Sequence, residues 1–395
     1  MKIIEGGVCA AKGFKAGSVR CGVKESRTND DTAIIFSECE CTAAATYTMN
    51  RVKAAPLYVT MEHLEDGVAR AIVANAGNAN ACAPDGMENA RRMAKAAAQL
   101  LGVAETDVAV ASTGVIGQRL NIECIEEHLP ELKLEDNASE KANRAIMTTD
   151  TKPKTAAVEF TIGGICKGSG MIHPNMGTML SFITTDCAIT HEMLTDALQE
   201  NVKKTYNRVT VDGDTSTNDM CIVLANGMAG NTLIEWQDEE YQAFCKALNE
   251  VNTRLARQIA ADGEGATKLV TCTVKNSRSE EVAERLAKAV VGSNLVKAAM
   301  FGADANWGRV LCAMGYSKAP FRPEYVSVAF ESAAGSVAVC EKGAALDFDE
   351  ELAKKVLSES EVTIAVDVNE GEDSATAWGC DLTYDYVKIN GDYRT

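Results

Sequence analysis

Strand-like and helical stretches alternate along all 395 residues, with no low-complexity linker or internal repeat between them. Residues 68–74 are apolar and β-prone, and a turn-rich segment follows them before a helical pattern over 87–101. Chains of this kind pack helices against sheets. The sequence therefore predicts an α/β (α+β) fold, and its 46% of hydrophobic residues can form the core of one large or two medium domains.

Other segments predict further elements of the same kind. A short apolar run at 108–111 places Ser112, Thr113 and Gly114 where a strand opens into a loop, with backbone N–H groups available. Thr190 and Ser279 are expected to cap helices. Strands are predicted at 326–330, 362–368 and 382–389, the last because apolar and polar residues alternate there.

Composition excludes several classes of protein. The net charge of −17 without a basic patch argues against binding to nucleic acid or to anionic membranes. The N-terminus lacks the apolar stretch of a signal sequence, and no segment approaches 18 uncharged apolar residues, so a soluble, cytoplasmic protein is expected.

Fourteen cysteines are scattered without CxxC spacing, Cys39 and Cys41 being the closest pair. We expect most of them to be small buried hydrophobes, and no metal site is predicted.

The most unusual segment is 167–186, KGSGMIHPNMGTMLSFITTD, in which a glycine-rich loop leads directly into a strand-like run at Thr178. A threonine hydroxyl is a weak nucleophile and needs a base, but the chain has only four histidines. Cleavage before Thr178 would free an α-amine with a pKa of about 7.7–8.0, which can serve as that base. Gly177 tolerates the backbone geometry that such a cleavage requires. On these residues alone, an ordinary loop-to-strand boundary remains the alternative.

The same segment closely resembles the cleavage segment of the ornithine acetyltransferase family, also called bifunctional ArgJ or glutamate N-acetyltransferase. Further motifs resemble the family in the same order along the whole chain: GGVCAAKGFKAG, VANAGNANAC, ASTGVIG, MTTDTKP, VDGDTSTND, DGEGATK, FGADANWGR and INGDYRT. The departures are small: Gly177 stands where alanine is common, Ser181 where a smaller residue is usual, and Cys9 and Ala11 alter the opening motif. Such a glycine could change the rate of cleavage without preventing it.

The resemblance implies a layered fold with sheets between helices, of the self-processing DmpA/ArgJ type. Cleavage would divide the chain into an α chain, residues 1–177, and a β chain, residues 178–395, which stay intertwined as one catalytic unit. Two such heterodimers would assemble into a heterotetramer. The motifs VDGDTSTND and FGADANWGR lack the spacing of an EF-hand and are expected to shape turns around the site.

The resemblance also implies roles for individual residues. Thr178 would be the nucleophile, and Thr113 and Gly114 would stabilise the oxyanion, a contribution of about 3–4 kcal/mol for such donors. Substrate contacts are expected from Thr148, Lys167, Thr178, Glu264, Asn390 and Thr395. Among the threonines of MTTDT, Thr148 is favoured, although Thr149 and Thr151 are too close in sequence to set aside.

The activity implied is a ping-pong transfer of acetyl from N2-acetylornithine to glutamate through an acetyl-threonine ester, in the cyclic pathway of arginine biosynthesis. No metal or organic cofactor is expected, although some members of the family also take acetyl-CoA as donor. Two other functions stay open. One is a related self-cleaving aminopeptidase or amidase, which would pass the acyl group to water. The other is a non-catalytic acidic binding protein whose bond before Thr178 stays intact.

Overall fold

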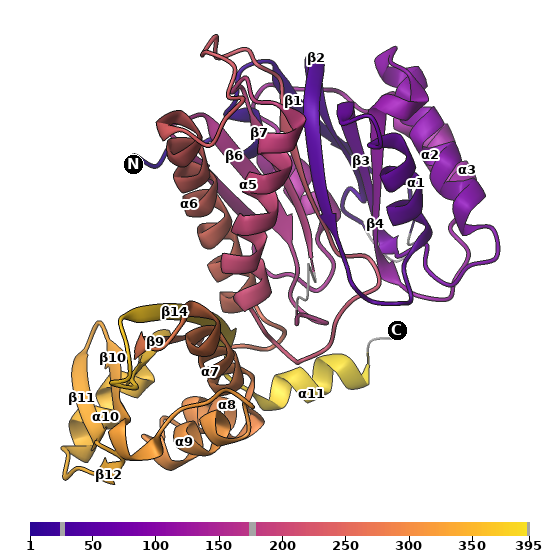
Figure 1. Cartoon of the computed structure of the whole chain (residues 1–395). Helices are drawn as coiled ribbons and strands as arrows, with labels where there is room; N and C mark the ends of the chain where they lie inside the picture. The colour runs from indigo at the N-terminus through magenta and orange to yellow at the C-terminus, as the bar shows by residue number, and fades with distance from the viewer. Residues whose placement is uncertain (24–27, 174–178, 393–395) are drawn as a thin grey trace. The chain divides into compact units, whose positions relative to one another are not determined.

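The computed structural model describes residues 1–23, 28–173 and 179–392, and the chain divides into two compact units (Figure 1). Unit 1 comprises Met1–Gly168, Pro174–Asn207 and Asp214–Leu255, and unit 2 comprises Ser169–His173, Arg208–Gly213 and Ala256–Thr395. Each unit has its own sheet. The predicted mixed class of helices packed on sheets is confirmed, and the two units correspond to the two-domain alternative.

Unit 1 is built on an eight-stranded sheet with the order β4-β3-β2-β8-β7-β6-β5, and β1 pairs with β2 beside this path. The pairs β3/β4 and β7/β8 are parallel and the others antiparallel. The strands are β1 (Phe14–Val19), β2 (Thr32–Tyr47), β3 (Val68–Asn78), β4 (Val108–Val115), β5 (Lys154–Val158), β6 (Ile162–Lys167), β7 (Leu180–Thr185) and β8 (Met220–Ala225).

Helices cover both faces of this sheet. They are α1 (Ala55–His63), α2 (Gly86–Leu101), α3 (Ile122–His128), α4 (Ser139–Ile146), α5 (His191–Lys204) and α6 (Glu239–Ala261, in unit 1 as far as Leu255). Consecutive residues of β2 point to opposite faces. Ile34 packs with Met93 of α2, whereas Ile35 shares a cluster with Ile146 of α4. Helices α5 and α6 run side by side (Figure 1), joined by a hydrogen bond from Asn201 Nδ2 to the carbonyl of Cys245.

A polar chain crosses the apolar interior of unit 1. Ser181 Oγ lies 2.8 Å from the hydroxyl of Tyr206, which in turn lies 3.3 Å from Oδ1 of Asn252, and all three side chains are buried. Buried hydroxyls are stabilising only when they are paired. Ser181, one of the departures from the family pattern, therefore has a partner within the core.

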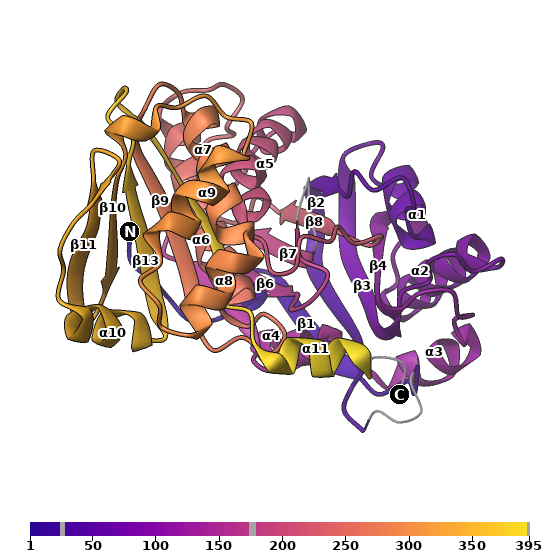
Figure 2. The same ribbon diagram turned by 90° about the horizontal axis from the view of Figure 1, so that it is seen from below.

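Unit 2 contains a six-stranded sheet with the order β12-β11-β10-β13-β9-β14, in which only β13 and β9 are parallel. Its strands are β9 (Leu269–Ser277), β10 (Ser327–Ser332), β11 (Gly335–Glu341), β12 (Ala344–Ala345), β13 (Glu361–Asp367) and β14 (Asp373–Cys380). Its helices are α7 (Glu280–Gly292), α8 (Asn294–Phe301), α9 (Trp307–Gly315), α10 (Glu350–Ser358) and α11 (Tyr384–Gly391). Figure 2 shows α7, α8 and α9 together beside the sheet, and their apolar residues share one core with β9 and β13.

Several predicted boundaries are confirmed. The helix expected at 87–101 is α2, and the side chains of Thr190 and Ser279 cap α5 and α7 as predicted. The motif FGADANWGR forms a turn in which Asn306 caps α9. Of the fourteen cysteines, eight are buried, and all fourteen are free thiols.

The strand predicted at 382–389 is wrong, because this segment is helix α11. The carboxylate of Asp381 accepts hydrogen bonds from the backbone N–H groups of Thr267 and Lys268, which ends β14 at Cys380. Thr383 then caps the helix by accepting from the N–H of Tyr386. No residue of α11 is buried, so the alternation of apolar and polar residues did not reflect one face of a sheet.

Candidate functional site

The first predicted site residues lie at the end of β4. In the parallel pair of β3 and β4, Gly114 lies beside Gly77. Gly114 has a φ of +136°, and a Cβ atom on it would lie 2.3 Å from the carbonyl carbon of Gly77. Only glycine fits at this position, since a side chain would collide with backbone in a conformation that other residues rarely adopt. The expected loop begins later than predicted, because β4 continues through Thr113 and Gly114 to Val115.

Asparagine side chains hold the backbone next to Thr113. Asn218 Nδ2 donates to the carbonyl oxygens of Ala79 and Ser112, at 2.6 and 2.8 Å. The hydroxyl of Ser112 donates to Oδ1 of Asn75 at 2.6 Å. Asn75, Asn218 and Ser112 are buried, so these bonds fix one backbone position. Sequence reasoning did not single out Asn75 or Asn218, although the density of asparagine in VANAGNANAC and VDGDTSTND was the available signal.

Lys167 brings a positive charge to the same place. It is the last residue of β6, not part of a loop as the sequence suggested, and it is 8% exposed. Its Nζ atom donates to Oγ1 of Thr113 at 3.2 Å. Because an ammonium group can only donate, the Thr113 oxygen is the acceptor in this bond, and its own O–H can donate elsewhere. A hydroxyl donor next to an ammonium charge suits a developing oxyanion.

The carboxylate of Asp150 lies behind Lys167. It accepts hydrogen bonds from the N–H of Gly168 at 2.7 Å, from the N–H of Thr148 at 3.0 Å and from Nζ of Lys154 at 2.7 Å. Lys167 Nζ is 4.0 Å from its second oxygen. Burial by itself would raise the pKa of Asp150, but the charges of Lys167 and Lys154 outweigh burial and hold that pKa well below its ordinary value. Asp150 is therefore ionised and paired.

A second buried carboxyl belongs to Asp219, the residue before β8. Burial raises its pKa well above the ordinary value, although the nearby hydroxyls of Thr48 and Ser216 and the charge of Lys167 act in the opposite direction. One of its oxygens, Oδ2, has no hydrogen-bond partner within the described part of the chain. The pKa values of the two carboxyls near Lys167 thus shift in opposite directions, downward for Asp150 and upward for Asp219.

The MTTDT segment supplies Thr148 to this cluster. Thr148 and Thr149 are half-buried and Thr151 is exposed. The backbone N–H of Thr148 shares the Asp150 carboxylate with Lys167 and Lys154. The sequence analysis considered only the threonines of this segment and did not single out Asp150. Its position inside the motif was the one feature that could have indicated a functional role.

Two further predicted residues meet in unit 2. Asn390 Nδ2, on α11, donates to Oε2 of Glu264 at 2.8 Å, and Glu264 is only 6% exposed. The backbone of Glu264 is tied to the carbonyl of Ser169 at 3.1 Å. Gly170 leaves room for the carboxylate, because a Cβ atom on Gly170 would lie 2.2 Å from the Glu264 side chain. The structure therefore joins Glu264 and Asn390, and the substrate contacts expected of both stay predictions.

Three predicted positions, Gly177, Thr178 and Thr395, lie outside the described residues. Description resumes at Met179, the residue before β7, whose carbonyl accepts a hydrogen bond at 2.9 Å from the N–H of Met220, the first residue of β8. The roles expected of these three positions stay predictions.

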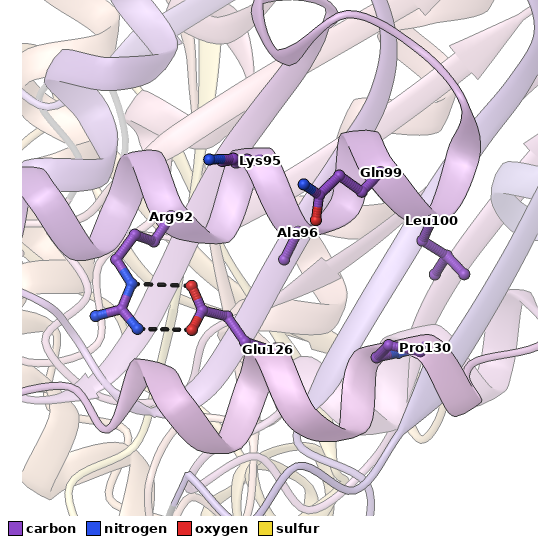
Figure 3. Close-up of a pocket in the computed structure, with 7 residues that line it drawn as sticks. All are labelled: Arg92, Lys95, Ala96, Gln99, Leu100, Glu126 and Pro130. Carbon is purple, nitrogen blue, oxygen red and sulfur yellow. Dashed lines mark hydrogen bonds and ion pairs between the residues drawn. The ribbon is translucent and has the colours of Figure 1, made fainter.

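A pocket of about 650 Å³ lies elsewhere in unit 1, between α2 and the segment formed by α3 and Pro130 (Figure 3). Arg92 and Glu126 face one another across it in a bidentate ion pair, with N···O distances of 2.9 and 2.6 Å. None of the predicted site residues lines it.

Within the described ranges, no group of three or more His, Cys, Asp or Glu side chains could hold a metal ion. None of the helices described combines the length and the apolar composition needed to cross a membrane.

Comparison with known proteins identifies the family. The model of the ArgJ family matches residues 15–395. The chain is 51% identical to the arginine biosynthesis bifunctional protein ArgJ of Caldanaerobacter subterraneus subsp. tengcongensis and 46% identical to the glutamate N-acetyltransferase of Methanocaldococcus jannaschii, with 100% of each chain covered. The crystal structure of arginine biosynthesis bifunctional protein ArgJ from Bacillus halodurans is similar at 44% identity and a TM-score of 0.51, over 54% of this chain and 99% of that one. Because the match extends over nearly the whole sequence, this chain belongs to the ArgJ family.

Proposed function

We propose that this protein is a glutamate N-acetyltransferase of arginine biosynthesis, which moves acetyl from N2-acetylornithine to glutamate. The observation that carries the proposal is the sequence identity along the full length of the chain, which is 51% to a bifunctional ArgJ protein and 46% to a glutamate N-acetyltransferase. The buried contact between Lys167 and Thr113 supports it chemically, since acyl transfer requires donors for an oxyanion.

We propose further that the chain activates itself by cleavage between Gly177 and Thr178. The Thr178 hydroxyl would attack the Gly177 carbonyl, the acyl group would shift from nitrogen to oxygen, and water would hydrolyse the ester to release residues 1–177. The similar Bacillus halodurans chain aligns over 99% of its own length yet covers 54% of this one. This coverage supports the proposal, because a β chain of residues 178–395 would contain 218 of the 395 residues, a similar fraction of the sequence.

In the proposed reaction, Thr178 Oγ attacks the acetyl carbonyl of acetylornithine and its proton moves to the freed α-amine of Thr178. The tetrahedral oxyanion would accept hydrogen bonds from the Thr113 hydroxyl and the Gly114 N–H. Ornithine leaves as the amine after taking the proton, and the acetyl group remains as a threonine ester. The α-amine of glutamate then attacks this ester, and collapse of the second oxyanion gives N-acetylglutamate and free Thr178.

Substrate recognition is proposed for the predicted polar residues. The ammonium of Lys167 suits a substrate carboxylate or the developing oxyanion, and the carboxylate of Glu264 suits the side-chain ammonium of ornithine. Asn390 supports Glu264 through its 2.8 Å hydrogen bond. Thr148 and Thr395 complete the proposed set.

Acetyl-CoA is proposed as a second acetyl donor, because relatives that match the full chain are named bifunctional. The reaction proposed needs no metal or organic cofactor. As an enzyme of amino-acid biosynthesis the protein would act in the cytoplasm, as two α and two β chains. Assays with each donor at equal glutamate concentration, together with the mass of the native assembly, test these points.

The decisive experiment compares wild type with Thr178→Ala by denaturing mass spectrometry and by acetyl transfer. Wild type should appear as fragments of 177 and 218 residues and transfer acetyl to glutamate, whereas Thr178→Ala should stay a single inactive chain of 395 residues. Acetate release that does not depend on glutamate would instead indicate an amidase. An uncut wild type that nevertheless transfers acetyl would exclude the mechanism.

A further inference from the structure

The backbone shortly before the proposed cut is held by one carboxylate. Asp212, in the motif VDGDTSTND, accepts hydrogen bonds from two successive N–H groups, that of Met171 to Oδ2 at 2.6 Å and that of Ile172 to Oδ1 at 2.8 Å. The motif was expected only to shape turns, and Asp212 had no role of its own. We propose that Asp212 is a positioning residue for self-cleavage, which fixes the chain on the N-terminal side of the Gly177–Thr178 bond.

Met171 shows why the carboxylate is needed. Its φ is +54°, in the left-handed region that residues other than glycine adopt rarely and at a cost in free energy. Its side chain is exposed, so side-chain packing holds this conformation only in part. Two successive N–H groups that converge on one anion do hold it, and hydrogen bonds to a carboxylate are stronger than those between neutral groups. Asp212 therefore stabilises a turn that this sequence would otherwise avoid.

The chain on either side of this turn is fixed by contacts that do not use the carboxylate. The carbonyl of Ser169 accepts from the N–H of Glu264 at 3.1 Å. The side chain of Ile172 is buried, and its carbonyl accepts from the N–H of Val211 at 2.7 Å. All of these residues belong to unit 2. Removal of the Asp212 carboxylate should therefore release the orientation of two peptide groups while the segment stays attached.

This orientation matters because the proposed cleavage is intramolecular. Thr178 Oγ forms a bond to the Gly177 carbonyl carbon, the bond from that carbon to the Thr178 nitrogen breaks, and the hydroxyl proton moves to this nitrogen. Water then hydrolyses the ester to a Gly177 carboxylate and the Thr178 hydroxyl, and the released proton is taken by the new α-amine. Such reactions gain much of their rate from groups that are already held in place. The Met179 carbonyl is bonded to the N–H of Met220 on the C-terminal side, as Asp212 bonds the backbone on the N-terminal side.

This inference rests on the proposed self-cleavage, and the rate of cutting in freshly translated protein tests it. Samples of a cell-free translation are denatured at intervals, and mass spectrometry gives the fraction of chain that is still intact. Asp212→Ala removes both acceptors and should slow cutting at least about tenfold. Asp212→Asn keeps one oxygen and should give an intermediate rate. Asp373→Ala changes an exposed aspartate of unit 2 and is the control, which should be cut at the wild-type rate.

A second measurement separates positioning from folding. Once cut, Asp212→Ala should transfer acetyl with kcat and KM within about twofold of wild type, because Glu264 keeps its hydrogen bonds to Asn390 and to Ser169. A damaged fold would instead lower the rate of cutting and kcat together. If Asp212→Ala does not fold, the same comparison is made with Asp212→Asn.

Slower cutting with an unchanged kcat supports the proposal. Three results would overturn it. In the first, the Asp212 variants are cut at the wild-type rate. In the second, the rate of cutting and kcat fall by the same factor, and in the third neither variant folds; in both cases the role of Asp212 is only structural. A wild-type chain that stays intact is a different result, because it rejects self-cleavage itself before any variant is compared.

Discussion

Nζ of Lys167 and Oγ1 of Thr113 are 3.2 Å apart in the interior of unit 1, although 54 positions separate the two residues along the chain. The ammonium group polarises the hydroxyl that is proposed to donate to the oxyanion. Both residues are less than a tenth exposed, so water screens this interaction poorly. The hydroxyl proposed to donate to the oxyanion therefore lies on β4 beside an ammonium group from β6.

Replacing Lys167 tests this pairing directly. Lys167→Met keeps most of the volume but removes the ammonium group, and kcat for acetyl transfer should fall by about 10²-fold. Lys203→Met, which changes an exposed lysine on α5, is the control and should leave kcat unchanged. Steady-state kinetics on processed enzyme measure both variants. A Lys167→Met enzyme with wild-type kcat would show that the contact with Thr113 has no part in catalysis.

Gly114→Ala should disrupt the end of β4. The added Cβ would lie 2.3 Å from the carbonyl carbon of Gly77 at a φ of +136°, so we expect a loss of at least about 3 kcal/mol in stability and loss of acetyl transfer. Gly117→Ala is a matched control, because Gly117 also has a positive φ, +79°, but open space around it. Thermal melting should show a much smaller effect for Gly117→Ala, and equal losses would contradict the argument from the collision.

Glu264→Gln tests recognition of the donor. The change keeps the shape and leaves an oxygen that can accept from Asn390, but it removes the charge proposed to bind the ornithine ammonium. We expect the KM for acetylornithine to rise about 10- to 100-fold, the range for a hydrogen bond to a charged group. The exposed Glu331→Gln is the control. An unchanged KM would remove Glu264 from the proposed substrate contacts.

Asp219→Asn should make the protein more stable at high pH. Because burial raises the folded-state pKa of Asp219, its contribution to stability is greatest at low pH and is lost as the pH rises through that folded value. Asparagine cannot ionise, so the Tm of the variant should exceed that of wild type by a margin that grows as the pH rises above the ordinary pKa of an aspartate. The gain is about 2–4 °C for each kcal/mol recovered. A difference in Tm that does not change with pH would contradict a raised pKa of Asp219 in the folded protein.

The sequence was informative where local signals agreed with packing. The helix at 87–101 was predictable because its apolar face repeats at helical spacing, and α2 places Ala90, Met93 and Ala97 in the core. The helix in segment 382–389 was not predictable in this way. Alternation of apolar and polar residues indicates a strand only when a neighbouring strand is available to pair with it. Asp381 instead bonds the backbone of Thr267 and Lys268, and no pattern within eight residues could reveal that contact.

The candidate site shows the same limit. Motifs indicated Thr113, Lys167, Glu264 and Asn390, and the structure places Thr113 beside Lys167 and Glu264 beside Asn390. Asp150 escaped notice because its importance comes from tertiary contacts with residues on either side of a hairpin. An aspartate in a polar motif normally indicates a turn, and only burial reveals that it is the counterion of two lysines.

The close packing of Gly170 against Glu264 has a consequence for how this family can vary. Any residue larger than glycine at 170 would occupy the space of the carboxylate, with its first carbon 2.2 Å from the Glu264 side chain. A side chain at position 170 would therefore displace the Glu264 carboxylate from its hydrogen bond with Asn390, unless position 264 shortened at the same time. Homologous sequences should consequently show these two positions as a covarying pair, with glycine retained wherever the glutamate is kept.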